Sequence, residues 1–148
     1  MAKIEKAITR QGKERGRLLA LLKQAQGESG YVSEKSILTA AQSLDISIGE
    51  VYGVTTFYSY LSSKPLGRNV IRVCKNLPCY LKNSQIIIDC LADELGVEPG
   101  ETTPDGKFSL LLTNCIGGCD GAPAMLINDD IHMDLTPDKI SGILKAYK

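Results

Sequence analysis

Four of the five cysteines stand in two pairs, and this spacing constrains the fold more than any other feature of the sequence. Cys74 and Cys79 enclose four residues in VCKNLPCY, and Cys115 and Cys119 enclose three in TNCIGGCDGAP, with 35 residues between the pairs. Each pair begins at the end of an apolar run that is typical of a strand. Loops at the same end of neighbouring strands would bring all four sulfur atoms together.

The composition of the chain favours an intracellular metal or redox role for these thiols. The N-terminal stretch MAKIEKAITRQGKERGR has charges but no apolar signal-peptide region, so we expect a cytoplasmic protein. Lasting disulfides are rare in that compartment, where clustered cysteines more often bind metal or carry out redox chemistry. Seventeen basic residues balance 17 acidic ones, which argues against a nucleic acid or an anionic membrane as partner. No apolar run approaches the roughly 20 residues that span a bilayer, so we expect no membrane insertion.

Residues 1–64 are predicted to form a three-helix bundle, a domain suited to docking on a partner. The leucines of RGRLLALLKQAQ give the first helix an apolar face, and we expect Gly27 and Gly30 to end it. Ser33 and Ser47 are the expected N-caps of the second and third helices. The third helix is expected to end in a turn near Lys64.

Residues 65–148 are predicted to follow the order strand, helix, three strands, helix. The expected strands are VIRVC, FSLLLTN, AMLI and IHMDL, and the expected helices are SQIIIDCLADELG and the segment that begins at Thr136 and Pro137. This order predicts a small α/β layer with a mixed sheet. The fold class expected for the whole chain is therefore α+β or α/β, with a helical domain followed by a sheet domain.

Four thiols that converge leave three interpretations of the site. Structural zinc takes four cysteines at paired spacings of about two to four residues, which both pairs fit. A two-iron cluster takes two thiolates on each metal. A redox disulfide favours C-x-x-C, which this sequence lacks. Gly117 and Gly118 allow backbone N–H groups to approach the sulfur atoms, with further room at Gly100 and Gly121, and such donors favour the cluster over zinc.

A set of segments around and between the cysteine pairs carries a more specific signal. In chain order they are GYVSEKSILTAAQSL, EVYGVTTFYSYLSSKPLGRNVIRVC, CKNLPCYLKNS, TNCIGGCDGAPAMLIND and DLTPDKISGIL. Over nearly the whole chain they resemble the small thioredoxin-like 2Fe-2S subunit family of respiratory complex I and of NAD-linked hydrogenases and formate dehydrogenases. The resemblance implies a thioredoxin-like second domain with a four-stranded mixed sheet, and Cys74, Cys79, Cys115 and Cys119 as ligands of one 2Fe-2S cluster. Asn114 departs from the family, in which an acidic residue often precedes the third ligand, and the lost charge would slightly raise the reduction potential.

The same resemblance implies an electron-transfer subunit of an NAD(H)-dependent oxidoreductase complex, without a complete active site on this chain. The sequence has no GxGxxG motif and no P-loop, so we do not expect this chain to bind NAD(H) or flavin alone. The resemblance implies that FMN, NAD(H) and further Fe-S clusters are held by partner subunits. These partners would be a flavin- and NAD(H)-binding Fe-S subunit and a larger Fe-S catalytic subunit of hydrogenase or formate dehydrogenase type. The expected complex is a prokaryotic NADH dehydrogenase or electron-bifurcating hydrogenase. Two alternatives stay open, a structural zinc-binding module and a free-standing ferredoxin.

Three other features are interpreted as structural. Cys90 falls on the apolar face of the helix at 84–96 and is interpreted as a buried small hydrophobic residue. His132, the only histidine, is interpreted as a surface or packing residue. A group of aromatic residues is interpreted mainly as core or inter-domain packing, with a partner-docking surface as the alternative. Its members are Tyr52, Phe57, Tyr58 and Tyr60.

Overall fold

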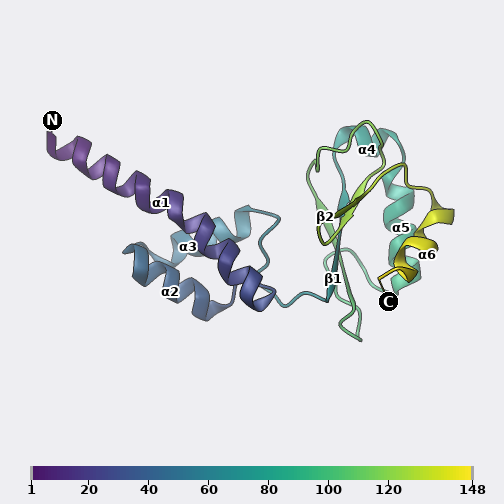
Figure 1. Ribbon diagram of the computed structural model, residues 1–148, viewed down its shortest axis with the longest axis horizontal. Coiled ribbons are helices and arrows are strands. Elements are labelled where there is room, and N and C mark those ends of the chain that lie inside the picture. The colour runs from purple at the N-terminus through teal and green to yellow at the C-terminus, as the bar shows by residue number, and fades with distance from the viewer. Residues whose placement is uncertain (1, 148) are drawn as a thin grey trace. The chain divides into compact units, whose positions relative to one another are not determined.

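The computed structural model describes the backbone of residues 2–147 and the side chains of residues 16–147. The chain divides into two compact units, one up to Pro65 and the other from Leu66 onward (Figure 1). Each unit has its own apolar core. The boundary expected from the sequence lies one residue earlier. None of the helices in the described part of the chain combines the length and apolar character needed to cross a membrane.

The first unit is built from three helices that contact one another: α1 (Ala2–Ser29), α2 (Glu34–Leu44) and α3 (Ile48–Phe57). Both expected N-caps are confirmed. The Oγ atom of Ser33 accepts a hydrogen bond from the Ser36 N–H, and that of Ser47 accepts one from the Glu50 N–H. The shared core consists of Leu18, Leu22, Val32, Ile37, Ala40, Ala41, Leu44, Val51 and Leu61.

Two helix ends differ from those expected. Helix α1 passes through Gly27 and ends at Ser29, because only Gly30 adopts the left-handed φ of 79° that terminates a helix. Helix α3 ends at Phe57, well before Lys64, and Leu61 reaches the core from a turn instead of from the helix. The β-branched residues near the end of α3 weaken its last turn, since their hydroxyl groups bond back to helix carbonyls.

The second unit has the expected order of strands and helices, with one additional short helix. Its elements are β1 (Asn69–Cys74), α4 (Leu77–Leu81), α5 (Ser84–Leu95), β2 (Phe108–Thr113), β3 (Met125–Ile127), β4 (Asp130–His132) and α6 (Pro137–Lys145). The sheet order is β2-β1-β3-β4, in which β1 pairs parallel with β2 and antiparallel with β3, and β3 pairs antiparallel with β4. The predicted four-stranded mixed sheet is therefore confirmed. The additional helix is α4, which begins at Leu77 and Pro78.

Helices α5 and α6 pack on each other and on the sheet, and Figure 1 shows them together on one side of it. Gly96 ends α5 in the left-handed conformation, directly after Leu95. Thr136 and Pro137 begin α6. The core between sheet and helices consists of Ile71, Val73, Ile87, Ile88, Leu91, Val97, Phe108, Leu110, Met125, Ile127, Leu135, Ile140 and Leu144.

The pairing of the strands determines where the cysteines lie. Cys74 ends β1 directly opposite Thr113, the last residue of β2. Because these two strands are parallel, the chain leaves both of them at the same edge of the sheet. The loop 114–124, which carries Cys115 and Cys119, therefore starts beside Cys74.

Candidate metal centre

Cys74 and Cys79 form a buried pair at the end of β1 and in α4. Their side chains are 1% and 2% exposed, and they pack with Ala124 in a small cluster apart from the main core. Ala124 contacts both residues through its backbone. Its carbonyl accepts a hydrogen bond from the Cys74 N–H over 3.2 Å, and its N–H donates to the Cys79 thiol. The Cys74 thiol lies near enough to raise the pKa of Cys79.

Cys115 and Cys119 form an exposed pair on the loop 114–124. Their Sγ atoms lie 3.5 Å apart. The Gly117 N–H donates a hydrogen bond to the Cys115 sulfur over 3.4 Å, which the left-handed backbone of Gly117, with φ at 86°, allows. The expected approach of a backbone N–H group to a thiol in this loop is thus present at Gly117.

The two pairs lie close enough to interact electrostatically. The pKa of Cys79 is raised, first by burial, and Cys74 and Cys119 add to the rise. The pKa of Cys119 is raised, first by its hydrogen bond to Cys115, and Cys74 adds to this rise as well. The pKa of Cys115 is lowered, first by the Gly117 N–H and then by the Cys119 thiol. The structure therefore brings all four thiols into one neighbourhood.

The separation of the two exposed sulfur atoms suits ligation of one metal by that pair. A tetrahedral metal with sulfur ligands at about 2.3 Å places two of them about 3.8 Å apart, close to the observed 3.5 Å between Cys115 and Cys119. Among the described side chains, those of residues 16–147, no three His, Cys, Asp or Glu groups are arranged to hold a single metal ion. The donor set is thus two pairs of thiols, and a two-iron cluster takes two thiolates on each iron. These residues fit that cluster.

Comparison with known proteins gives the family. Residues 4–148 match the family model described as thioredoxin-like [2Fe-2S] ferredoxin. The chain belongs to this family. The resemblance that the sequence motifs indicate is therefore confirmed.

Two relatives of this thioredoxin-like [2Fe-2S] ferredoxin cover most of its length, and both are subunits of an NADH-quinone oxidoreductase. The ferredoxin is 40% identical to the subunit from Pseudomonas aeruginosa over 126 residues, which cover 85% of this chain and 76% of the relative. It is 42% identical to the subunit of the same name from Escherichia coli K12 over 127 residues, which cover 86% of this chain and 76% of the relative.

A solved structure shares the fold of this thioredoxin-like [2Fe-2S] ferredoxin. It is the air-oxidized NAD+-reducing [NiFe]-hydrogenase, with a TM-score of 0.75 and 23% sequence identity. The alignment covers 88% of the present chain but only 22% of the hydrogenase chain, so the match spans about a fifth of that chain.

Three other residues considered in the sequence, Cys90, His132 and Gly100, lie away from the cysteine pairs of the ferredoxin. Cys90 is half-buried on α5 and packs against the main core, and its pKa is raised first by burial and then by nearby carboxylates. His132 is half-buried, with Nε2 3.0 Å from the Tyr147 hydroxyl, as a packing residue would be. Gly100 hydrogen-bonds to Leu110, midway along β2.

The aromatic group of the ferredoxin is exposed, so its interpretation as core is wrong. The side chain of Phe57 is 79% exposed, and those of Tyr52, Tyr58 and Tyr60 are exposed as well. These residues follow the end of α3 or lie on its outer side, while Val51 and Thr55 face the core. Helical periodicity alone does not show that the helix ends before Tyr58.

Contacts that the sequence analysis missed surround the loop 114–124. The Ala124 backbone joins the first cysteine pair to the start of β3, and Met133 lies against Gly118 and Gly121. The sequence signal for these contacts is weak. Ala124 and Met133 carry no feature that distinguishes them from ordinary apolar residues of a strand.

Proposed function

We propose that Cys74 and Cys79 bind one iron of a single 2Fe-2S cluster, and that Cys115 and Cys119 bind the other. The observation that carries this proposal is that two thiol pairs meet at the shared edge of two parallel strands. The match of residues 4–148 to the thioredoxin-like [2Fe-2S] ferredoxin family supports this cluster over the alternative of structural zinc. When bound, such a cluster accepts and returns one electron at a time.

Backbone N–H groups are directed at one proposed ligand in each of the two thiol pairs. The N–H groups of Ala124 and Gly117 point at the sulfur atoms of Cys79 and Cys115. Such hydrogen bonds stabilise negative charge on the thiolates, and this charge increases when an electron is added.

The proposed role is that of an electron-transfer subunit in an NAD(H)-dependent oxidoreductase complex. The names of the relatives from Pseudomonas aeruginosa and Escherichia coli support a complex of the NADH-quinone oxidoreductase type. FMN, NAD(H) and further Fe-S clusters would be held by a flavin-binding Fe-S subunit and a larger Fe-S catalytic subunit. An electron-bifurcating hydrogenase would use the chain in the same way, and in either complex we place it in the cytoplasm of a prokaryote.

We further propose that the helical unit, residues 1–64, docks on the flavin-binding partner. Its exposed aromatic residues support this role, since large aromatic side chains on a surface commonly anchor protein interfaces. Phe57 and Tyr58 stack edge to face with their ring centroids 5.1 Å apart, so they present one apolar surface. A free-standing ferredoxin would have no partner surface on which to bury these side chains.

Anaerobic purification of the full chain tests the cluster. We expect about two irons and two sulfides per chain, visible absorption, and a spin-one-half EPR signal on reduction. A colourless protein with about one zinc per chain would overturn the proposal. Purification from the native cell under gentle conditions tests the partner, and we expect a flavoprotein to accompany the chain.

A further inference from the structure

The segment that follows β4 lies against the loop that carries the second cysteine pair. The Asp134 N–H donates to the Gly121 carbonyl over 2.6 Å, and the Leu135 N–H donates to the Pro123 carbonyl over 3.1 Å. The same segment is anchored elsewhere, because the Leu135 side chain is buried in the main core and the Asp134 carbonyl accepts a bond from Lys139 Nζ over 2.7 Å. It therefore ties the loop 114–124 to the core and to α6.

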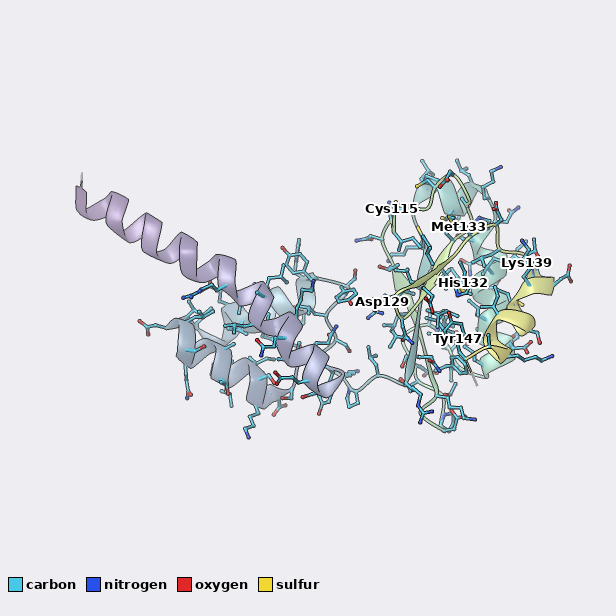
Figure 2. The ribbon with its side chains drawn as sticks, viewed as in Figure 1. Cys115, Asp129, His132, Met133, Lys139 and Tyr147 are labelled. Carbon is cyan, nitrogen blue, oxygen red and sulfur yellow. The ribbon has the colours of Figure 1, made fainter. Side chains whose placement is uncertain are left out.

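Met133, at the start of this segment, occupies the space beside two glycines that flank Cys119. A Cβ atom built on Gly121 would lie 2.7 Å from the Met133 Cβ and 3.0 Å from its Sδ. A Cβ atom on Gly118 would lie 3.3 Å from the Met133 Sδ and 3.1 Å from Ile131 Cδ1. Figure 2 shows Met133 and Cys115 toward the same end of the second unit.

The reason for glycine at these two positions is space and not backbone conformation. Gly117 has a left-handed φ of 86° and no atom within 4 Å of a built Cβ, so its backbone requires glycine. Gly118 and Gly121 lie outside the left-handed region. What they lack is room for a side chain. Met133 takes that room at Gly121, and Met133 shares it with Ile131 at Gly118.

We propose that Met133 is a positioning residue for the proposed cluster ligands Cys115 and Cys119. By packing on Gly118 and Gly121, its side chain holds the loop at the separation of the two sulfur atoms that ligation requires. Groups that orient metal ligands from the outside affect metal affinity and electronic properties without touching the metal. A flexible thioether suits an irregular surface made of two glycine backbones. This inference rests on the proposed 2Fe-2S function.

The first test compares Met133→Ala with Met133→Leu in the full chain carrying its cluster. We expect Met133→Ala to change the g-values of the reduced EPR signal and to accelerate cluster loss to a ferrous chelator roughly tenfold. Met133→Leu keeps most of the side-chain volume and should restore both properties. An EPR spectrum and a loss rate that stay as in the natural chain for Met133→Ala would overturn the inference.

A second test uses the different atoms that the two glycines meet. Gly118→Ala is crowded by Ile131 Cδ1 and by the Met133 Sδ. Met133→Ala removes the second of these contacts, so the double variant should retain its cluster better than Gly118→Ala alone. Gly121→Ala is crowded by the Met133 Cβ, which alanine keeps, so Met133→Ala should give little relief. Equal rescue of both glycine variants, or rescue of neither, would contradict the proposed contacts.

The outcomes separate this inference from the proposed function. If the unsubstituted chain purifies without iron and sulfide, the 2Fe-2S proposal itself is wrong. If the unsubstituted chain holds the cluster, and the Met133 variants have the same EPR spectrum and rate of cluster loss, only the positioning role of Met133 is wrong. If Met133→Ala binds no cluster, the alkylation rate of Cys119 is measured in the cluster-free chain instead. We expect the Cys119 thiol to react several-fold faster in Met133→Ala, because the loop is loosened. A rate equal to that of the natural chain would refute the positioning role.

Discussion

The backbone N–H of Gly117 donates a hydrogen bond to the Cys115 sulfur over 3.4 Å, two residues back along the same loop. This contact favours the thiolate form, since a donor stabilises negative charge on sulfur. Cys115 also accepts from the Cys119 thiol, so the pKa of Cys115 is lowered while that of Cys119 is raised. Within the exposed pair, Cys115 therefore loses its proton at a lower pH than Cys119.

In the cluster-free chain we expect iodoacetamide to modify Cys115 before Cys119. The thiolate is the reactive form, and a lowered pKa gives a larger thiolate fraction below the ordinary thiol pKa of about 8.5. The rate at Cys115 should therefore rise at lower pH than the rate at Cys119, as mass spectrometry of initial products would measure. Cys74 and Cys79 are buried and should react slowest. Equal pH profiles at Cys115 and Cys119 would contradict the assigned hydrogen bonds.

Replacement of single cysteines distinguishes ligands from packing residues. Cys115→Ser should remove most of the iron, because it deletes one of the proposed ligands. Cys90→Ser should leave iron and sulfide content unchanged and lower the free energy of unfolding by about 1 kcal/mol, since it places a hydroxyl at the edge of the core. Iron analysis and thermal unfolding measure both effects. Loss of the cluster in the Cys90 variant would show that the ligand assignment is wrong.

The features predicted correctly from the sequence are those that depend on neighbouring residues. The strand ending at Cys74 and the caps at Ser33 and Ser47 follow from local side-chain chemistry. The closeness of the cysteine pairs also follows, because two short strands of one small sheet end at a common edge. Their parallel pairing then decides that Cys74 stands opposite Thr113.

The features missed depend on contacts between distant segments or on the conformation of single residues. Gly27 and Gly30 look alike in the sequence, yet only Gly30 adopts a left-handed φ and ends α1. Helix α4 spans only five residues, too few for an apolar periodicity to appear. Met133 packs on Gly121, which lies 12 positions earlier in the sequence on the other side of a turn. No local sequence pattern indicates this contact.

Loss of the Ser33 cap should destabilise the helical unit without affecting the cluster. Ser33→Ala removes the acceptor for the Ser36 N–H, which should lower the free energy of unfolding of this unit by about 1 kcal/mol. Ser43→Ala on the same helix is the matched control. The Ser43 hydroxyl only donates to the Ala40 carbonyl within the helix, so its loss should be close to neutral. Urea unfolding followed by circular dichroism measures the difference, and equal effects of the two variants would argue against the cap.

The exposed aromatic surface of the helical unit gives the test of partner docking. Phe57→Ser should weaken binding of the flavin-binding partner by about 2 kcal/mol, near 30-fold in Kd, if this ring is a central anchor. Leu38→Ser is the control, because Leu38 is a similarly apolar, exposed residue on α2 of the same unit. Both variants should keep the iron content and EPR spectrum of the natural chain, since neither residue belongs to the unit with the cysteines. Titration of each variant against the purified partner measures the difference, and equal affinities for the Phe57 variant and the natural chain would place the docking surface elsewhere.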